Sequence, residues 1–354
     1  MTSKKYIACA VSVLCLFMII NLALWHGIVK QNFNQREINR MGSITTPQPI
    51  IEEKHYQRHH TELVDYLASG KIESFDVLTI GDSFSNTEYN YQDYIVDTYG
   101  LKILNARIQY TPLSDVYILL NLGIIDEIKP RVIIIESVER GVQDRFGSYE
   151  IVSNISSDIT RERIILSKPN TTAASISSGI FAPILVKSSI KFLYDKVYHF
   201  LKPEQLSPEI YITKLDRNFF TNPGQENTLL HYFEDFNYLK KPLNAEMVNQ
   251  NLNTAARLLK AKGITLIFFV AADKSDLYYP YILNKKGRSQ NPFFQKMRDV
   301  QGKEYTYIDT LPILRQALER GEKDVYWLDD LHWSHKGIKI FCDELVKYIL
   351  PELR

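Results

Sequence analysis

The hydrophobic pattern predicts an α/β domain from residue 75 onward. Mainly apolar runs at 75–80, 101–106, 132–135, 264–270 and 305–309 predict strands, and the continuous β-branched run at 132–135 is typical of a strand that is covered on both faces. Apolar residues at helical spacing predict helices over 87–99, 111–128, 244–262 and 335–349. Alternation of this kind indicates a parallel sheet between two helical layers, in which ligands bind at the carboxyl ends of the strands.

An earlier apolar segment, Tyr6–Trp25, has the length and composition of a membrane-spanning helix. It is too long for the core of an ordinary signal peptide and lacks a small-residue cleavage site before His26, so we interpret residues 1–26 as a cytoplasmic tip and an uncleaved signal anchor. Lys4 and Lys5 favour a cytoplasmic amino terminus, although basic residues between 30 and 40 weaken this signal.

Composition shifts suggest the remaining boundaries. Residues 27–74 are polar and mixed and are expected to form a stalk and a first helix. The α/β pattern occupies 75–141 and 243–354. Residues 142–242, which are rich in Ser, Asn, Tyr and Phe, interrupt it and are predicted to be an inserted subdomain or cap.

Charge and cysteine content exclude several classes of function. The net charge of +1 over 354 residues, without a dense basic tract, argues against nucleic-acid binding. Two of the three cysteines lie in the apolar segment, so a disulfide framework and cysteine metal sites are not expected. His55 and His59 have the spacing of a helical metal pair, but we interpret them, with His60, as part of a solvated helix.

The strand predicted at 75–80 ends in Gly81-Asp82-Ser83 and is followed by a helix. A serine at a sharp strand-to-helix turn is raised above the sheet edge, and its own N–H can face a developing oxyanion. The same three residues also occur in ordinary turns, so this motif needs a partner.

A second motif, Trp327-Leu-Asp-Asp-Leu-His-Trp-Ser334, supplies a candidate base near the carboxyl end. A serine needs an imidazole to accept its proton, and a carboxylate that orients the imidazole. His332 is the candidate base, and either Asp330 or Asp329 is close enough in sequence to orient it. The alternative is a surface turn with a helix-capping aspartate.

Together these motifs resemble those of the SGNH hydrolases, and more specifically the SGNH-like polysaccharide O-acetyltransferases, including the alginate O-acetyltransferases and the DHHW-motif proteins. The similar segments are 81–85 (Gly-Asp-Ser-Phe-Ser), 130–140, Ala272-Asp-Lys274 with Tyr278, and Asp330-Leu-His-Trp333. In this chain the Asp-His element follows the serine, whereas in the alginate enzymes it precedes it. The Gly-x-Asn-Asp block of typical SGNH esterases is absent, and residues 136–140 stand in its place.

The resemblance implies a flavodoxin-like three-layer α/β/α domain in which Ser83 is the nucleophile, His332 the base and Asp330 the orienting carboxylate, with Asp329 as the alternative. The Ser83 N–H and Asn105 would stabilise the oxyanion. The remaining residues of these motifs would either line the site or form an internal salt-bridge cluster: Glu136, Glu139, Arg140, Lys274 and Tyr278. No metal or organic cofactor is needed, because Ser83 carries the acyl group.

Three alternative functions are therefore considered, with the first as the expected one. The first is a single-pass membrane protein with an extracytoplasmic domain, which accepts acetyl from a polytopic membrane acyltransferase and passes it to a hydroxyl of a cell-surface or secreted polysaccharide. The second is a carbohydrate esterase in which water is the acceptor. The third is a non-catalytic glycan-binding or scaffold protein of the envelope.

Overall fold

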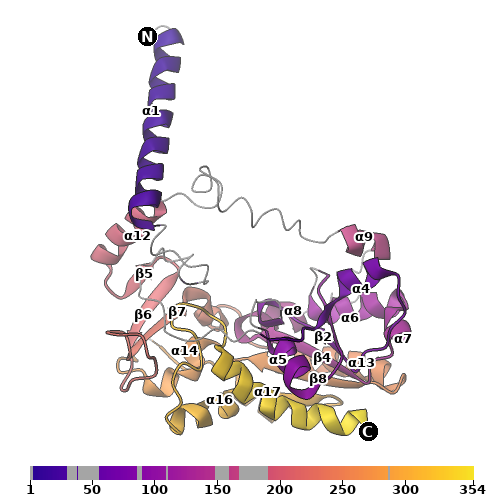
Figure 1. The fold of residues 1–354 in the computed structure, drawn as a ribbon. Coiled ribbons are helices and arrows are strands. Elements are labelled where there is room, and N and C mark those ends of the chain that lie inside the picture. Colours follow the sequence, from indigo (N-terminus) through magenta and orange to yellow (C-terminus); the bar gives the residue numbers. More distant parts are fainter. Residues whose placement is uncertain are drawn as a thin grey trace.

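The structure is a computed structural model, and it describes residues 3–29, 38, 56–85, 90–108, 111–147, 159–166, 190–285 and 288–354. An α/β domain contains most of the described residues, and a long helix projects from it (Figure 1).

A six-stranded parallel sheet forms the centre of this domain, with the strand order β1-β3-β2-β4-β8-β9. The strands are β1 (Thr61–Glu62), β2 (Val77–Ile80), β3 (Ile103–Ala106), β4 (Val132–Val138), β8 (Thr265–Ala271) and β9 (Thr306–Asp309). Apart from the short edge strand β1, this is the flavodoxin-like order 2-1-3-4-5, as the sequence predicts. The switch in strand order therefore falls between β2 and β4, which are neighbours in the sheet.

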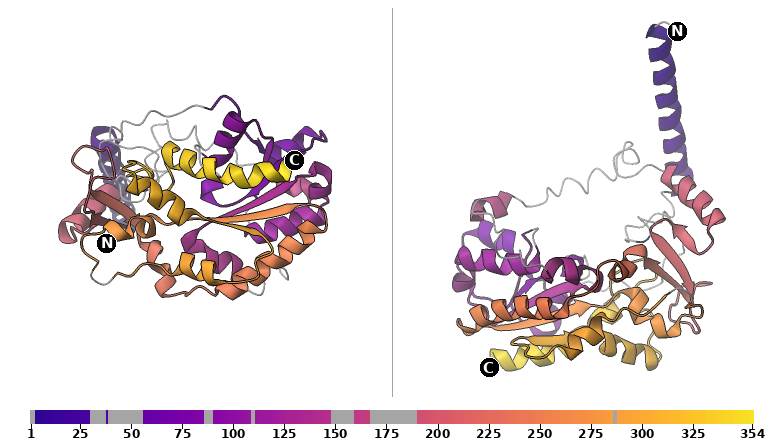
Figure 2. Two further views of the ribbon diagram at one scale, coloured as in Figure 1. Left: turned by 90° about the horizontal axis from the view of Figure 1, so that it is seen from below. Right: turned by 180° about the vertical axis from the view of Figure 1, so that it is seen from behind.

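Helices cover both faces of the sheet. Helix α17 (His335–Ile349) packs on α5 (Tyr91–Tyr99) and α16 (Thr310–Glu319), while α13 (Ala245–Lys260) packs on α6 (Pro112–Asn121) and α8 (Val142–Phe146). Figure 2 (left) shows α17 and α13 on opposite sides of the sheet. The three-layer arrangement explains why every residue of β2, β3 and β4 is buried.

The other described elements of the chain outside the main sheet include further helices and 3-10 turns. The helices are α4 (Leu63–Ser69), α7 (Ile124–Ile128), α9 (Arg161–Leu166), α12 (Ile190–Leu201), α14 (Lys274–Leu277) and α15 (Phe293–Asp299). The 3-10 turns are η2 (Ser83–Ser85), η3 (Glu139–Gly141), η4 (Phe233–Leu239), η5 (Tyr279–Tyr281) and η6 (Leu350–Leu353).

Local sequence explains where the predicted helices begin and end. Helix α17 spans the predicted residues, and its cap is Ser334, whose hydroxyl accepts hydrogen bonds from two amides of the first turn. The helix predicted over 111–128 is instead two helices, α6 and α7, because Gly123 adopts a left-handed conformation (φ 68°) between them. Helix α5 begins at Tyr91 because Asn90 caps it, with its side chain accepting a hydrogen bond from the Asp93 amide, while residues 86–89 of the predicted helix lie outside the described part.

The amino-terminal helix α1 (Ser3–Leu24) continues into a π-helical turn, η1 (Trp25–Val29). Its segment Lys4–Gly27 is long and apolar enough to cross a membrane, with a mean hydropathy of 2.7 in its most apolar part. Figure 1 shows it projecting away from the α/β domain.

The segment predicted as an insert contributes a second sheet. Strands β5 (Gln205–Ser207), β6 (Ile210–Lys214) and β7 (Thr228–Tyr232) are antiparallel and separate from the main sheet. Two elements cross the predicted boundaries: β1 adds residues from the predicted stalk to the main sheet, and α8 from the predicted insert packs on α13.

Candidate active site

Ser83 lies immediately beyond β2, on a tight turn of residues 81–85 that we call the nucleophile turn. Its side chain is exposed, whereas its neighbours Phe84 and Ser85 are buried. Within the described part of the chain, neither the hydroxyl nor the backbone N–H of Ser83 makes a hydrogen bond. The turn therefore presents a serine hydroxyl and an N–H donor together at the carboxyl end of a central strand, where α/β proteins bind ligands.

Asp82 fixes the nucleophile turn to the neighbouring strand β4. Its carboxylate accepts hydrogen bonds from the amides of Val138, at 2.7 Å, and Phe84, at 3.2 Å, and it pairs with the guanidinium of Arg145. Burial raises the pKa of Asp82, but the Arg145 charge and these hydrogen bonds outweigh burial and lower it overall. The ionised Asp82 thus holds the turn across the switch point between β2 and β4.

Glu136 does not line the site; its carboxyl group holds the nucleophile turn by hydrogen bonds from inside the domain. It is fully buried on β4, and its carboxyl group accepts hydrogen bonds from the Asp82 amide at 2.9 Å and the Ser85 hydroxyl at 2.8 Å. Burial, and then the nearby Asp82 charge, raise the pKa of Glu136 well above its usual value. Gly81 is required beside it, because a Cβ there would collide with both Glu136 and Ser85.

Asn105 is also a buried support of this turn. Its side-chain nitrogen donates to the Ser85 carbonyl at 3.1 Å and to the Glu62 carboxylate at 3.4 Å, and its oxygen accepts from Thr79 at 2.9 Å. Since the amide hydrogens are engaged and the side chain is buried, Asn105 does not act as an oxyanion donor in this conformation. The Ser83 N–H remains the donor that the geometry favours.

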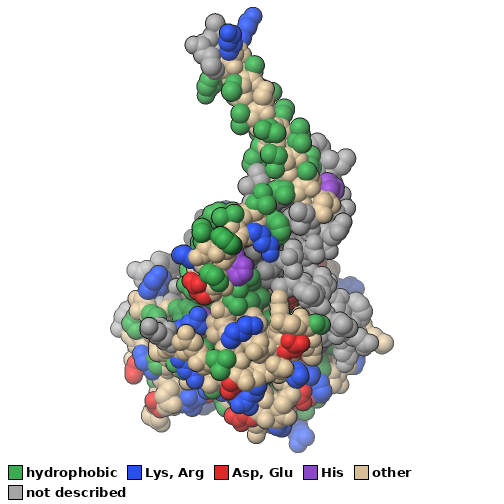
Figure 3. Space-filling model, turned by 90° about the vertical axis from the view of Figure 1, so that its left-hand side faces the viewer, with side chains coloured by type: hydrophobic (Ala, Val, Ile, Leu, Met, Phe, Trp, Pro, Cys, Tyr) green, Lys and Arg blue, Asp and Glu red, His purple; other side chains and the backbone are tan. Residues whose placement is uncertain are grey.

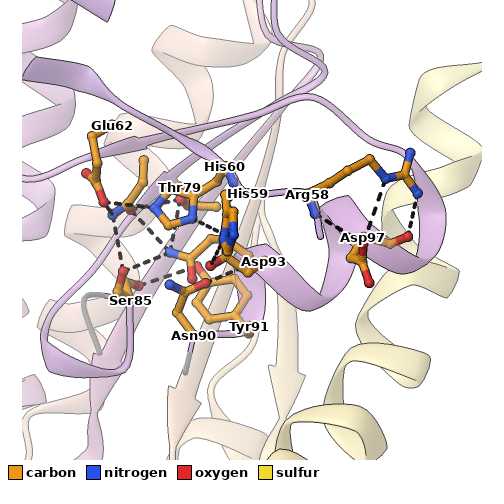
Figure 4. Close-up of polar contacts among 12 residues, drawn as sticks. Arg58, His59, His60, Glu62, Thr79, Ser85, Asn90, Tyr91, Asp93 and Asp97 are labelled. Carbon is orange, nitrogen blue, oxygen red and sulfur yellow. Dashed lines mark hydrogen bonds and ion pairs between the residues drawn. The ribbon is translucent and has the colours of Figure 1, made fainter. Parts of the chain in front are cut away.

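The histidines before β1 extend this network, and here the predicted solvated helix is wrong. His59 and His60 precede β1 and are not helical, and both contact the Asp93 carboxylate of α5, with Nδ1–Oδ distances of 2.9 Å and 2.6 Å (Figure 4). Nε2 of His60 lies 2.8 Å from Glu62, which also contacts Asn105. Burial lowers the pKa of His60, but Asp93 and Glu62 outweigh burial and raise it to about 9. His55 lies outside the described residues, and no group of metal-binding side chains is found among those described.

The candidate base comes to the nucleophile turn from the opposite end of the chain. The His332 ring packs on Phe84, the residue after Ser83, with ring centroids 4.8 Å apart. Nδ1 of His332 lies 2.6 Å from the Asp330 carboxylate, which also accepts the backbone N–H of His332 at 3.0 Å. Because both contacts are made by Asp330, the geometry favours Asp330 over Asp329 as the orienting carboxylate.

Lys274, the first residue of α14 just after β8, holds the loop that carries His332. Its buried ammonium donates to the backbone carbonyls of Trp327 at 2.8 Å, Leu328 at 3.0 Å and Asp330 at 3.0 Å. Burial lowers the pKa of Lys274 to about 7, although nearby carboxylates act in the opposite direction. Lys274 is therefore a positioning residue behind the loop and does not face a substrate.

Arg140 belongs to an internal salt-bridge cluster, the second of the two roles that the sequence left open. It pairs with Asp273 and lies 3.6 Å from Asp235, while Glu139 accepts the Asp273 amide at 2.9 Å. Glu139 and Asp273 are buried just beyond the carboxyl ends of β4 and β8, and the buried Asp235 comes from η4. Tyr278 is also fully buried and packs on Phe219 and Phe220 of the segment between β6 and β7.

Comparison with known families finds a similarity over the carboxyl-terminal part of the chain. Residues 230–352 match the model of the SGNH hydrolase-like domain of the acetyltransferase AlgX. This part of the chain, which is less than half of it, is similar to an AlgX-like domain of the SGNH type. Such a domain suggests serine-dependent acyl transfer or ester hydrolysis. The match contains Lys274, Asp330 and His332 but does not extend to Ser83, whose role is inferred from the geometry of the site.

A comparison with curated proteins finds no match. Among solved structures, a mutant acetyl-xylooligosaccharide esterase from Geobacillus Stearmophilus is similar, with 12% identity, a TM-score of 0.38 and coverage of 79% of this chain and 96% of the other.

Several supporting residues were not predicted. Arg145 lies beyond the predicted catalytic segment, and Asp93 has no distinguishing sequence signal. The sequence shows the adjacent His59 and His60, but it does not indicate their partner, because Asp93 lies more than 30 residues away.

Proposed function

We propose that this protein is a membrane-anchored, extracytoplasmic O-acetyltransferase that carries acetyl on Ser83 and passes it to a hydroxyl of a cell-surface or secreted polysaccharide. The observation that carries the proposal is the meeting of the nucleophile turn and the His332 loop, through the contact between Phe84 and His332, with Asp330 already bonded to the imidazole.

The proposed chemistry has two half-reactions with one acyl-enzyme between them. His332 accepts the proton of the Ser83 hydroxyl as the Ser83 oxygen attacks the acetyl carbonyl carbon. The oxyanion that forms accepts a hydrogen bond from the Ser83 backbone N–H. Collapse of this intermediate expels the donor's leaving group, which takes the proton from His332. A sugar hydroxyl then loses its proton to His332 and attacks the acetyl carbon, and the departing Ser83 oxygen recovers that proton.

The choice of acceptor rests on the matched family, whose model is described as an acetyltransferase. Water as the acceptor would make the same site an esterase, because both reactions share the acyl-enzyme. Support for the transferase comes from α1, since an anchored site can receive acetyl from a polytopic membrane acyltransferase in the same bilayer.

The test uses the full chain in lipid nanodiscs, with p-nitrophenyl acetate as the acetyl donor and a panel of unacetylated oligosaccharides as acceptors. A nitrophenol burst followed by acetylated oligosaccharide supports the transferase. Steady release of acetate without sugar product would instead establish an esterase. Absence of a burst and of acylated protein would contradict both enzymes and leave the scaffold role.

A further inference from the structure

Helix α12 has its apolar face turned away from the protein. Its inward side carries the buried residues Phe192 and Asp195, and Asp195 is paired with Lys191 at 2.7 Å. The outward side carries five exposed apolar residues: Leu193, Tyr194, Val197, Phe200 and Leu201. A helix on the surface of a globular domain normally shows the reverse arrangement.

These five residues form one continuous stripe, which we call the α12 stripe. At 100° per residue they fall within about a third of the helix circumference. Phe200, near the carboxyl end of the helix, is 83% exposed. Figure 3 shows the hydrophobic side chains gathered over this region.

Two lysines lie beside the α12 stripe: Lys196 borders it by helical spacing, and Lys202 directly follows the last residue of α12. Their stems lie along the helix, since Lys196 Nζ is 5.3 Å from the Phe192 ring and Lys202 Nζ is 5.1 Å from the Tyr198 ring. An apolar stripe with aromatic residues and flanking cations is typical of a helix that lies in a membrane interface, where lysines reach the headgroups.

The position of α12 fits the same partner. In Figures 1 and 2 it lies beside the foot of α1, where η1 places Trp25 at the end of the apolar segment. Tryptophan at this position is typical of a membrane–water interface. A bilayer crossed by α1 would therefore have its surface at the level of α12.

We propose that α12 lies in the surface of the bilayer that α1 crosses, with the α12 stripe in contact with lipid. This contact goes beyond the catalytic proposal, and it gives the domain a second attachment that fixes its orientation. The antiparallel sheet connects α12 to the α/β domain. Helix α12 packs on β5, and residues between β6 and β7 contact Tyr278 and Asp324.

The test measures the depth of single spin labels in the full chain, reconstituted in vesicles of phosphatidylethanolamine and phosphatidylglycerol. Tyr194→Cys places a label on the α12 stripe, in a background in which Cys9 and Cys15 are replaced by Ala and the buried Cys342 is retained. Tyr348→Cys is the matched control: it changes the same residue type, at 42% exposure against 54%, on α17 at the side of the domain away from α1. Leu193→Cys repeats the measurement on the stripe.

We expect the labels at 194 and 193 to collide more with oxygen and less with a water-soluble nickel chelate than the label at 348. If the ratio of oxygen collisions to nickel-chelate collisions at 194 and 193 equals the ratio at 348, the proposal is overturned. So would protection from both reagents, which would show that protein covers the stripe, either a second copy or another membrane protein.

A label on the native Cys15 of α1 separates this proposal from the anchor itself. A lipid signal at Cys15 with an aqueous signal at 194 would refute the α12 contact and leave the anchor intact. Aqueous signals at both positions would refute the anchor as well. Acetyl transfer is measured separately, so its presence or absence does not enter this result.

Discussion

The Asp330 carboxylate holds His332 by two hydrogen bonds, one with Nδ1 of the ring at 2.6 Å and one from the His332 backbone N–H at 3.0 Å. These hydrogen bonds fix the ring so that Nε2 is the nitrogen that would accept the serine proton. We therefore expect Asp330 and His332 to act as one unit. This relationship makes the two aspartates of the motif unequal.

We expect Asp330→Asn to lower the acylation rate by roughly 10³ to 10⁴-fold, because an amide stabilises neither the imidazolium nor the required tautomer. Asp329→Asn changes the adjacent residue in the same way and should have a much smaller effect on the rate. Burst kinetics with p-nitrophenyl acetate measure both variants, and equal losses would contradict the assignment of Asp330. Because Asp329 is buried, the thermal stability of each variant is measured in parallel.

Lys274→Met should destabilise the protein by about 2 to 4 kcal/mol, since three backbone carbonyls lose their donor inside the protein. Acylation should fall with it, because the same carbonyls belong to the loop that carries His332. Lys262→Met is the matched control: its exposed salt bridge with Asp126 is expected to contribute less than about 1 kcal/mol. Thermal unfolding gives the comparison, and similar losses for the two variants would contradict the role of Lys274.

His60 predicts a stability that depends on pH. Its pKa is about 9 in the folded protein against a usual 6.5, so the folded state binds an extra proton between these values. The stabilisation, up to about 3 kcal/mol, is fully present below pH 6.5 and is lost as the pH rises through 9. Compared with His60→Gln, the wild-type protein should therefore be more stable at pH 6, with a difference that shrinks toward pH 10.

His59→Gln serves as the control for His60, because His59 contacts the same carboxylate but its side chain is 63% exposed. Thermal unfolding at pH 6, 8 and 10 should show only a small difference from the wild-type protein for this variant. A difference for His60→Gln that stays constant across this range would show that its proton is not linked to folding.

Much of the fold could be predicted because it depends on local patterns. Mainly apolar runs predicted five of the six strands of the main sheet, and the Thr111-Pro112 and Asn244 caps set the starts of α6 and α13. The edge strand β1 was missed because two residues carry no periodicity, and its pairing with β3 is a tertiary contact. The outward apolar face of α12 could not be recognised either, since a helical pattern does not say which side faces the core.

The chemistry of the candidate site followed from motifs, whereas its supports depend on contacts between distant segments. Ser83, Asp330 and His332 stand in short recognisable stretches. Glu136, Asn105 and Lys274 were recognised by residue type, but only the structure shows that their polar groups hold the backbone of the nucleophile turn or of the His332 loop. Arg145 reaches Asp82 across 63 positions, which no local pattern encodes.

Intact-mass spectrometry of the full chain after brief exposure to p-nitrophenyl acetate tests the central claim most directly. We predict one acetyl group, located on Ser83 by peptide mapping, and its loss in Ser83→Ala and in His332→Ala. Ser85→Ala, which removes the buried hydroxyl two positions away, should destabilise the turn but still acquire acetyl on Ser83. Acetylation that persists at full level in Ser83→Ala, or that maps to another residue in the wild-type protein, would contradict the assignment of Ser83 as the nucleophile.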